Sequence, residues 1–259
     1  MSLPKEFQHS YEFDPKYSKS VAYFSMEFAI DQALKTYSGG LGFLAGSHMR
    51  SAYDLKQNVI GISILWKYGY YDQIRKGDQS MDVLFQEKIY RFLEDTNIKF
   101  SITINNHPVV VKAYYLKPET FGTVPIFFLS TDLPENDYLA QSTTHKLYDS
   151  DPAAKIAQTI LLGLGGAKLL DELNADVEIY HLNEAHALSA AFYLYKKFKS
   201  VEEVKKRLVF TTHTPEEAGN EKHDIRLLDK MGFFCGTPME EVRKISGIKD
   251  DVFDHTVIA

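Results

Sequence analysis

From Asp151 onward the sequence alternates between helix-like and strand-like segments, and this alternation constrains the fold more than any other feature. Asp151 is suited to cap a helix and Pro152 to occupy its first position, and the apolar spacing that follows predicts a helix. Val177–Leu182 and Arg207–Thr212 predict strands, with a helix over Glu184–Lys197 between them. Because such alternation builds parallel sheets covered by helices, we expect an α/β fold with a Rossmann-like parallel sheet and flanking helices.

The first part of the chain fits the same fold. Val21–Phe28 predicts a strand, and the apolar run Val59–Trp66 predicts a strand covered on both faces. Phe43–Gln57 has apolar or small residues close to a 3.6-residue period and predicts a helix between them. No internal repeat or low-complexity linker interrupts the pattern.

A β-rich stretch from about residue 85 to 135 interrupts the alternation. Phe100–Asn105 and Val109–Leu116, separated by Asn106–His107–Pro108, predict a β-hairpin. Val124–Ser130 predicts a further strand. These strands form either an insertion or an antiparallel wing on the main sheet.

The composition argues against several classes of function. The net charge of -6, from 29 Lys and Arg against 35 Asp and Glu, argues against a nucleic-acid binder and a basic membrane-surface protein, since both meet phosphates with dense positive charge. Cys235 is the only cysteine, so no internal disulfide forms, and without a local histidine it is predicted to be inert. The N-terminus has no apolar signal-peptide core, and no apolar run approaches the ~20 residues of a membrane span, so we expect a cytoplasmic protein.

Three groups of residues fall where predicted strands end or a helix begins, and open α/β sheets bind ligands beyond the carboxyl ends of their strands. The first is Gly39-Gly40-Leu41-Gly42, which opens a predicted helix. Its glycines allow close approach, and N–H groups at a helix start suit a phosphate or another anionic oxygen. A tight turn without a ligand is the alternative.

The second group is His181-Leu182-Asn183-Glu184-Ala185-His186, at the end of one strand and the start of the next helix. Asn183 is suited to cap that helix, which puts Glu184 and His186 in its first turn, and His186 is expected to be neutral because a helix N-terminus disfavours positive charge. A capping role for Glu184 and a plain buried imidazole for His186 are the alternatives. A metal site is disfavoured because the spacing is not His-Glu-x-x-His.

The third group is Thr211-Thr212-His213-Thr214-Pro215, directly after a predicted strand. Hydroxyls, an imidazole and a proline at a strand's carboxyl end favour a ligand site over plain turn bonding. Because neighbouring strands of one sheet end at the same edge, we expect His186 and His213 to face the glycine loop across one crevice. The glycines of 163–166 indicate a close approach of another backbone to their helix, and the aromatic stripe Trp66–Tyr71 is interpreted as core and rim.

Six segments, VAYFSMEF, YSGGLGFLAGSHMRSAYDL, GYYDQ, KIAQTILLGLGGAKLLDEL, HLNEAHA and VFTTHTPEEAG, occur in the order seen in α-glucan phosphorylases, so residues 20–225 resemble this family of glycogen, starch and maltodextrin phosphorylases. The resemblance implies that residues 1–259 form the N-terminal Rossmann-like domain of a two-domain GT-B glycosyltransferase. It implies a hexosyltransferase that cleaves an α-1,4-glucan or maltodextrin with inorganic phosphate to glucose 1-phosphate, with retention. A homodimer is a further implication of the resemblance.

The resemblance also assigns roles to individual residues. Gly40 would match the glycine whose N–H contacts the substrate phosphate, within a phosphate-binding loop of Gly39, Gly40 and Gly42. Leu41 would match the residue whose N–H contacts the glucosyl unit. His213 would match a catalytic histidine that lines the glucosyl site, and Glu184 and His186 would match the acidic residue and histidine beside that sugar.

Three departures qualify the resemblance. Lys155 stands where the family commonly has Arg, and the motif Pro215–Asn220 lacks the usual His-Asp, which appears later as His223-Asp224. The lysine that carries pyridoxal phosphate belongs to the family's second domain, which is absent here. We therefore expect this chain to be inactive by itself.

Two other functions stay open. A nucleotide-sugar glucan synthase shares the glycine loop, but synthases place a lysine two residues before the paired glycines, where this chain has Tyr37. A non-catalytic glucan-binding or interaction domain is the second alternative, and the missing second domain favours it.

Overall fold

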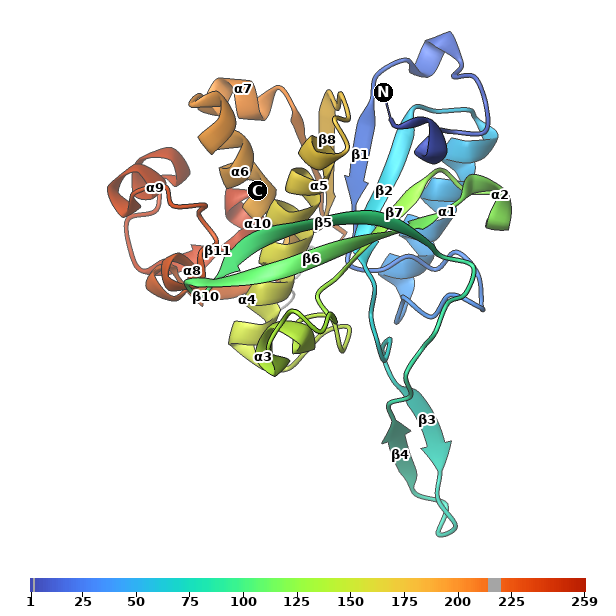
Figure 1. Cartoon of the computed structure of the whole chain (residues 1–259). Coiled ribbons are helices and arrows are strands. Elements are labelled where there is room, and N and C mark those ends of the chain that lie inside the picture. Colours follow the sequence, from blue (N-terminus) through green and yellow to red (C-terminus); the bar gives the residue numbers. More distant parts are fainter. Residues whose placement is uncertain (2, 214–219) are drawn as a thin grey trace.

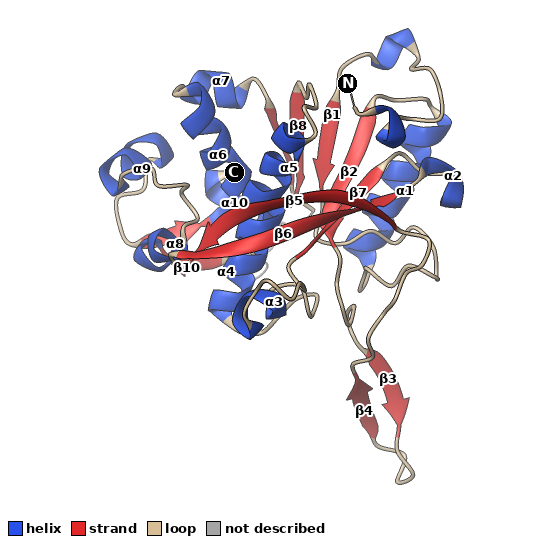
Figure 2. Ribbon diagram, in the orientation of Figure 1, coloured by secondary structure: helices blue, strands red, loops and turns tan. Residues whose placement is uncertain are grey.

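The computed structural model describes residues 1, 3–213 and 220–259. Among these residues, one seven-stranded sheet has the order β5-β6-β7-β2-β1-β8-β9, and two small sheets pair β3 with β4 and β10 with β11 (Figures 1 and 2). The strands of the large sheet are β1 Val21–Phe24, β2 Val59–Ile64, β5 Glu94–Ile104, β6 His107–Leu116, β7 Ile126–Ser130, β8 Ile179–Asn183 and β9 Leu208–Thr211. The short strands are β3 Asp72–Arg75, β4 Met81–Leu84, β10 Lys222–Asp224 and β11 Val252–Asp254. The helices are α1 Gly40–Asp54, α2 Pro118–Phe121, α3 Tyr138–Ser142, α4 Pro152–Ile160, α5 Gly166–Glu172, α6 Ser189–Phe198, α7 Val201–Lys205, α8 Ile225–Met231, α9 Met239–Ser246 and α10 His255–Ile258.

The predicted parallel sheet is confirmed. β1 pairs in parallel with β2 and β8, β2 pairs in parallel with β7, and β8 with β9. The order β7-β2-β1-β8-β9 reverses its direction at β1. The carboxyl ends of β1 and β8 therefore flank the switch point, where sheets of this kind bind ligands.

Helices cover both faces of the sheet because its strands are apolar on both sides. Phe24 and Ile62 belong to a core with residues of α4, α5 and α6, whereas Tyr23 and Val59, from the same two strands, belong to a core with residues of α1. Successive side chains of a strand point to opposite faces, so a strand buried at every position, as β2 is, needs cover on both.

The β-rich stretch forms an antiparallel wing on the main sheet. β5 pairs antiparallel with β6, and β6 pairs antiparallel with β7. The hairpin turns at Asn105 and Asn106, with φ of 51° and 62°, one residue earlier than predicted. Positive φ at both positions is the tight-turn geometry that asparagine favours. Figure 1 shows the two strands curving across the helices, and β5 contacts α5.

The core helix begins as predicted, since the Asp151 side chain accepts a hydrogen bond from the N–H of Ala154 at 2.9 Å and Pro152 is its first residue. A π-helical turn, Leu161–Gly165, joins α4 to α5. A Cβ at Gly163 would lie 2.4 Å from the carbonyl oxygen of Ala187. The close backbone approach predicted from the glycines is confirmed at this position.

The same helical run corrects one expectation. Pro152–Glu172 is long and apolar enough to cross a membrane by length and composition, although no run of that length was expected. Of its most apolar window, 78% is buried inside the fold. It is the helix that the sheet and the wing enclose.

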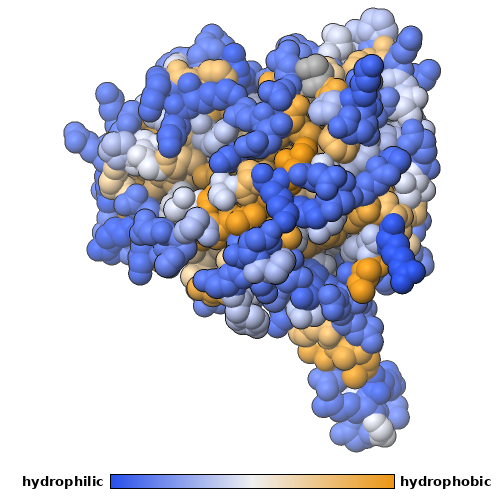
Figure 3. Space-filling model, viewed as in Figure 1, coloured by the Kyte–Doolittle hydropathy of each residue, from blue (hydrophilic) through white to orange (hydrophobic). Residues whose placement is uncertain are grey.

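A projecting arm formed by β3 and β4 was not predicted from the sequence (Figure 1). Its segment is largely polar, and its few apolar residues are exposed instead of buried in a core. Figure 3 shows apolar surface on the arm nearer the body and hydrophilic surface at its tip. Its exposed apolar residues include Ile74, Met81, Val83, Leu84 and Phe85.

Candidate functional site

A cavity of about 690 Å³ lies at the switch point of the sheet. Met26 lines it from the segment after β1, Glu184 from the segment after β8 and His213 from the segment after β9. Three carboxyl ends of parallel strands thus meet at one hollow, as the sheet order requires.

The cavity brings together the predicted substrate-binding residues. Its lining includes Gly40, Leu41, Glu184, His186 and His213. The expectation that both imidazoles face the glycine loop across one crevice is confirmed by this lining. The roles that the resemblance gives to these residues stay predictions.

The glycine loop divides into a part that faces the cavity and a part that does not. Gly39 and Gly42, predicted to bind phosphate with Gly40, are not among the described residues that line the cavity. A Cβ on Gly42 would lie 2.7 Å from Oε2 of Glu27, whereas a Cβ on Gly40 would meet nothing within 4 Å. Gly42 therefore packs against Glu27, and only Gly40 borders open space on the cavity side.

Glu27 is a residue of this site that the sequence did not single out. The predicted strand Val21–Phe28 ends at Phe24, and Glu27 lies in the loop that follows. Its carboxylate is buried and accepts hydrogen bonds from the N–H of Ser38 at 2.5 Å and of Gly39 at 3.3 Å. The only feature of the sequence that could have pointed to Glu27 is an acidic residue close to the end of a predicted strand.

The predicted cap by Asn183 is wrong. Asn183 is the last residue of β8, and Glu184 occupies the position before the short helical turn Ala185–Ala187. The Asn183 amide instead donates to the hydroxyl of Ser25 at 3.0 Å, and its Oδ1 lies 2.8 Å from Nε2 of His213. Asn183 thus joins the ends of three strands, a role that depends on partners distant in the sequence.

Glu184, next to the cavity, has a strained backbone conformation. Its φ is 63° and its ψ is 177°, a region that residues other than glycine rarely adopt. Its Oε1 accepts a hydrogen bond from the N–H of His213 at 2.5 Å, and its own N–H donates to the carbonyl oxygen of Thr211. These bonds fix Glu184 and His213 relative to each other, and strain of this kind is common at functional sites.

His186 is neutral for a different reason from the one predicted. Burial lowers the pKa of His186, because desolvation disfavours the charged imidazolium. Its Nδ1 is buried and has no hydrogen-bond partner among the described residues. His186 also lines the cavity, so its neutral imidazole is suited to exchange a hydrogen bond with a ligand hydroxyl there through an atom other than the buried Nδ1.

One wall of the cavity comes from residues that the sequence did not assign to a site. Lys155, Glu221, His223 and His255 line it, and Nζ of Lys155 lies 3.0 Å from Oε1 of Glu221. Nδ1 of His223 lies 3.0 Å from Nε2 of His255. The sequence signals for this wall were Lys155, at a position where the resembled family commonly has Arg, and the displaced His223-Asp224 pair.

The described residues do not fit an attached pyridoxal phosphate or a metal. Lys155 is the only described Lys or Arg that lines the cavity, and its amine is ion-paired with Glu221. A Schiff base needs an unpaired, neutral amine, and the cofactor's phosphate needs further cations. Within the described part of the chain, no group of three His, Cys, Asp or Glu could hold a metal ion.

Trp66 is fully buried and Tyr68, Tyr70 and Tyr71 are half-buried, as expected for core and rim. Burial raises the pKa of Cys235 to about 12, which agrees with an inert thiol. The last two residues of the third group, Thr214 and Pro215, lie outside the described residues, as do residues 216–219 of the motif that follows.

The chain is similar to known proteins over most of its length. It is 50% identical over 241 residues to an uncharacterized protein of Methanocaldococcus jannaschii, covering 93% of this chain and 46% of that protein. It is 32% identical to the maltodextrin phosphorylase of Thermococcus litoralis, covering 95% of this chain and 31% of that protein. The chain is homologous to a part of the maltodextrin and glycogen phosphorylases.

A second phosphorylase supports this relationship. The glycogen phosphorylase of Mycobacterium tuberculosis is 30% identical over 235 residues, covering 81% of this chain and 27% of that enzyme. No family model matches the chain. The chain spans less than half the length of each of these three relatives.

Proposed function

We propose that this chain forms the glucosyl- and phosphate-binding half of an α-1,4-glucan phosphorylase with two Rossmann-like domains. The observation that supports this most is the cavity at the switch point, lined by Gly40, Leu41, Glu184, His186 and His213 in a homologue of phosphorylases. The reaction would transfer a terminal glucosyl unit from an α-1,4-glucan to inorganic phosphate.

The helix start of α1 would bind the phosphate. The N–H groups of Gly40 and Leu41 have no intrahelical partner and no other partner among the described residues. A helix N-terminus favours an anion there through its dipole and its free N–H groups. In the proposed reaction, Gly40 would donate to the phosphate and Leu41 to the glucosyl unit.

The polar side chains opposite the loop would bind the sugar. His213 would line the glucosyl site, held by its bonds to Asn183 and Glu184. Glu184 would place a carboxylate beside the sugar, where positive charge develops in an oxocarbenium-like transition state. His186 would exchange a hydrogen bond with a hydroxyl.

We expect no phosphorolysis from these residues alone, because the described cavity offers no unpaired lysine for pyridoxal phosphate. The test is to incubate the purified chain with maltoheptaose, inorganic phosphate and pyridoxal phosphate and to assay glucose 1-phosphate. Release above the background of a Glu184→Ala, His213→Ala double variant would contradict this expectation.

Binding separates the proposal from its alternatives. Calorimetric titrations with glucose 1-phosphate, maltoheptaose and ADP-glucose are compared for the wild-type chain and the same double variant. Variant-sensitive binding of glucose 1-phosphate supports the phosphorylase half-site. Preference for ADP-glucose would favour the synthase, and binding of maltoheptaose alone, insensitive to the variant, would favour a non-catalytic glucan-binding domain.

A further inference from the structure

Glu27 is the only Asp or Glu among the described residues that is buried, with 2% of its surface exposed. Among the described residues, its carboxylate accepts hydrogen bonds from neutral donors: the N–H of Ser38, the N–H of Gly39, the Ser38 hydroxyl and the Tyr148 hydroxyl. No ion pair joins Glu27 to a cation of the described chain. A buried carboxylate is costly unless it is fully hydrogen-bonded, so the position of Glu27 demands these donors.

The hydrogen bonds of Glu27 decide which N–H groups of the glycine loop face the cavity. Oε2 accepts hydrogen bonds from the N–H groups of Ser38 and Gly39, the two residues that precede α1. The next two residues, Gly40 and Leu41, line the cavity. Glu27 therefore binds the back of the loop and leaves the following N–H groups for a ligand.

Close packing also fixes the Glu27 carboxylate against the glycine loop. Any Cβ at Gly42 would collide with Oε2 of Glu27 and with Cβ of Tyr37, each at 2.7 Å. Oε1 of Glu27 accepts from the hydroxyl of Tyr148 at 2.7 Å, and Tyr148 lines the cavity. Glu27 thus connects the start of α1 to a second residue that lines the cavity.

We propose that Glu27 is a positioning residue for the phosphate-binding edge of the site. By holding Ser38 and Gly39, its carboxylate directs the N–H groups of Gly40 and Leu41 into the cavity. The inference rests on the proposed function for the identity of the anion, while the holding of the loop is a property of the free protein. Glu27 acts through the loop and does not itself bind the anion, since like charges repel.

Amide hydrogen exchange of the unliganded chain tests the holding role. In the wild type, the amides of Ser38 and Gly39 should exchange more slowly than those of Gly40 and Leu41. Glu27→Ala should speed exchange at Ser38 and Gly39 by about tenfold or more, because their acceptor is gone. Unchanged protection at both amides would overturn the proposal.

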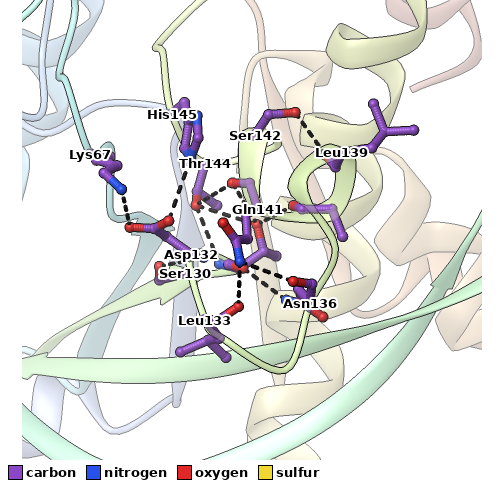
Figure 4. A network of polar contacts seen from close by, with 12 residues as sticks. Lys67, Ser130, Asp132, Leu133, Asn136, Leu139, Gln141, Ser142, Thr144 and His145 are labelled. Atoms are coloured by element: carbon purple, nitrogen blue, oxygen red, sulfur yellow. Dashed lines mark hydrogen bonds and ion pairs between the residues drawn. The ribbon is translucent and has the colours of Figure 1, made fainter.

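A matched control separates positioning from general destabilisation. Asn136 is also buried, and its side chain bonds the backbone of Val110 and Thr131 in a network after β7 (Figure 4). It does not line the cavity. Asn136→Ala should lower stability without speeding exchange selectively at Ser38 and Gly39, and equal effects of the two variants would overturn the proposal.

A titration with anions tests whether the loss of Glu27 weakens anion binding. Glucose 1-phosphate and inorganic phosphate are titrated while the amides of Gly40 and Leu41 are followed by NMR. The affinity should fall about tenfold in Glu27→Ala and hold in Asn136→Ala, since misdirected N–H groups lose their hydrogen bonds to the anion. Wild-type affinity in Glu27→Ala would overturn the proposal.

The two hypotheses fail in different ways. If the wild-type chain binds neither anion, the proposed function fails, and exchange at Ser38 and Gly39 still decides whether Glu27 holds the loop. If Glu27→Ala does not fold, Glu27→Gln replaces it. The glutamine keeps one acceptor oxygen, so exchange and affinity should lie between those of wild type and alanine, and wild-type values for both would count against the proposal.

Discussion

At the residue scale, the site depends on which atoms of a motif face the cavity, and a motif in the sequence does not show this. Gly39, Gly40 and Gly42 look equivalent in the sequence, but Gly42 packs against Glu27 and only Gly40 lines the cavity. Asn183 looks like a helix cap, but it bonds Ser25, 158 residues away in the chain. The polar residues at the strand ends could be predicted from the sequence. Their hydrogen-bond partners could not, because those depend on which strands are neighbours in the sheet.

Gly40→Ala separates folding from binding. Its Cβ would meet no atom within 4 Å and its φ is not in the left-handed region, so the free energy of unfolding should hold or rise by up to ~1 kcal/mol. The new methyl would border the N–H that binds the anion, so affinity for glucose 1-phosphate should fall about tenfold or more. Chemical denaturation and calorimetry measure the two quantities.

The same pair of measurements on Gly77→Ala provides the control, because a Cβ at Gly77 also meets nothing within 4 Å and Gly77 is outside the cavity. Wild-type affinity in Gly40→Ala would show that Gly40 does not border the ligand.

His255 makes the stability of the fold depend on pH. Burial lowers its pKa from 6.5 to about 3, and the neighbouring His223 and His186, which lower it further, have lowered pKa values as well. Between these pH values the unfolded chain binds a proton at His255 that the folded chain does not bind. The contribution of neutral His255 to the free energy of unfolding is therefore fully present above pH 6.5 and is lost as the pH is lowered toward 3.

Urea unfolding at pH 7.5 and pH 5 measures this contribution, which should be about 2 kcal/mol for His255 at pH 5. His255→Gln should reduce the loss of stability between the two pH values by this amount, whereas His107→Gln, at an exposed histidine of β6, should leave the loss unchanged. An equal pH dependence in wild type and His255→Gln would contradict the assignment.

At the element scale, the sequence predicted the strands and helices whose apolar patterns report burial. β2 is buried at every position, and buried and more exposed positions alternate along much of β5 and β6, so the apolar patterns of these strands predicted them. The β3–β4 arm was missed because its two strands are only four residues long, largely exposed and set in a mostly polar segment. The π-helical turn was missed because its glycines indicate a close approach but not the helix type that permits it.

Gly163→Ala tests the contact between the core helix and the segment that carries the site. The added methyl would lie 2.4 Å from the carbonyl oxygen of Ala187, which follows His186, and backbone cannot move aside as a flexible side chain can. The free energy of unfolding should fall by about 1–3 kcal/mol. Gly77→Ala, at an open position, is the reference in the same unfolding experiment, and equal stability of the two variants would refute the contact.

At the scale of the whole molecule, the order β7-β2-β1-β8-β9 places the site. The reversal at β1 brings the segments after β1, β8 and β9 to one cavity, although 158 residues separate Ser25 from Asn183. Parallel sheet and crevice followed from the alternation of elements. The wall formed by Glu221, His223 and His255 did not, because it depends on how the last part of the chain folds back.

The central claim is that this cavity binds a glucosyl unit beside an anion, and a titration of the isotopically labelled chain with glucose 1-phosphate tests it most directly. We predict saturable amide shifts at Gly40, Leu41, Glu184 and His213, with no comparable shifts in the β3–β4 arm. Shifts confined to other parts of the molecule, or none at these four residues at high ligand concentration, would contradict the account.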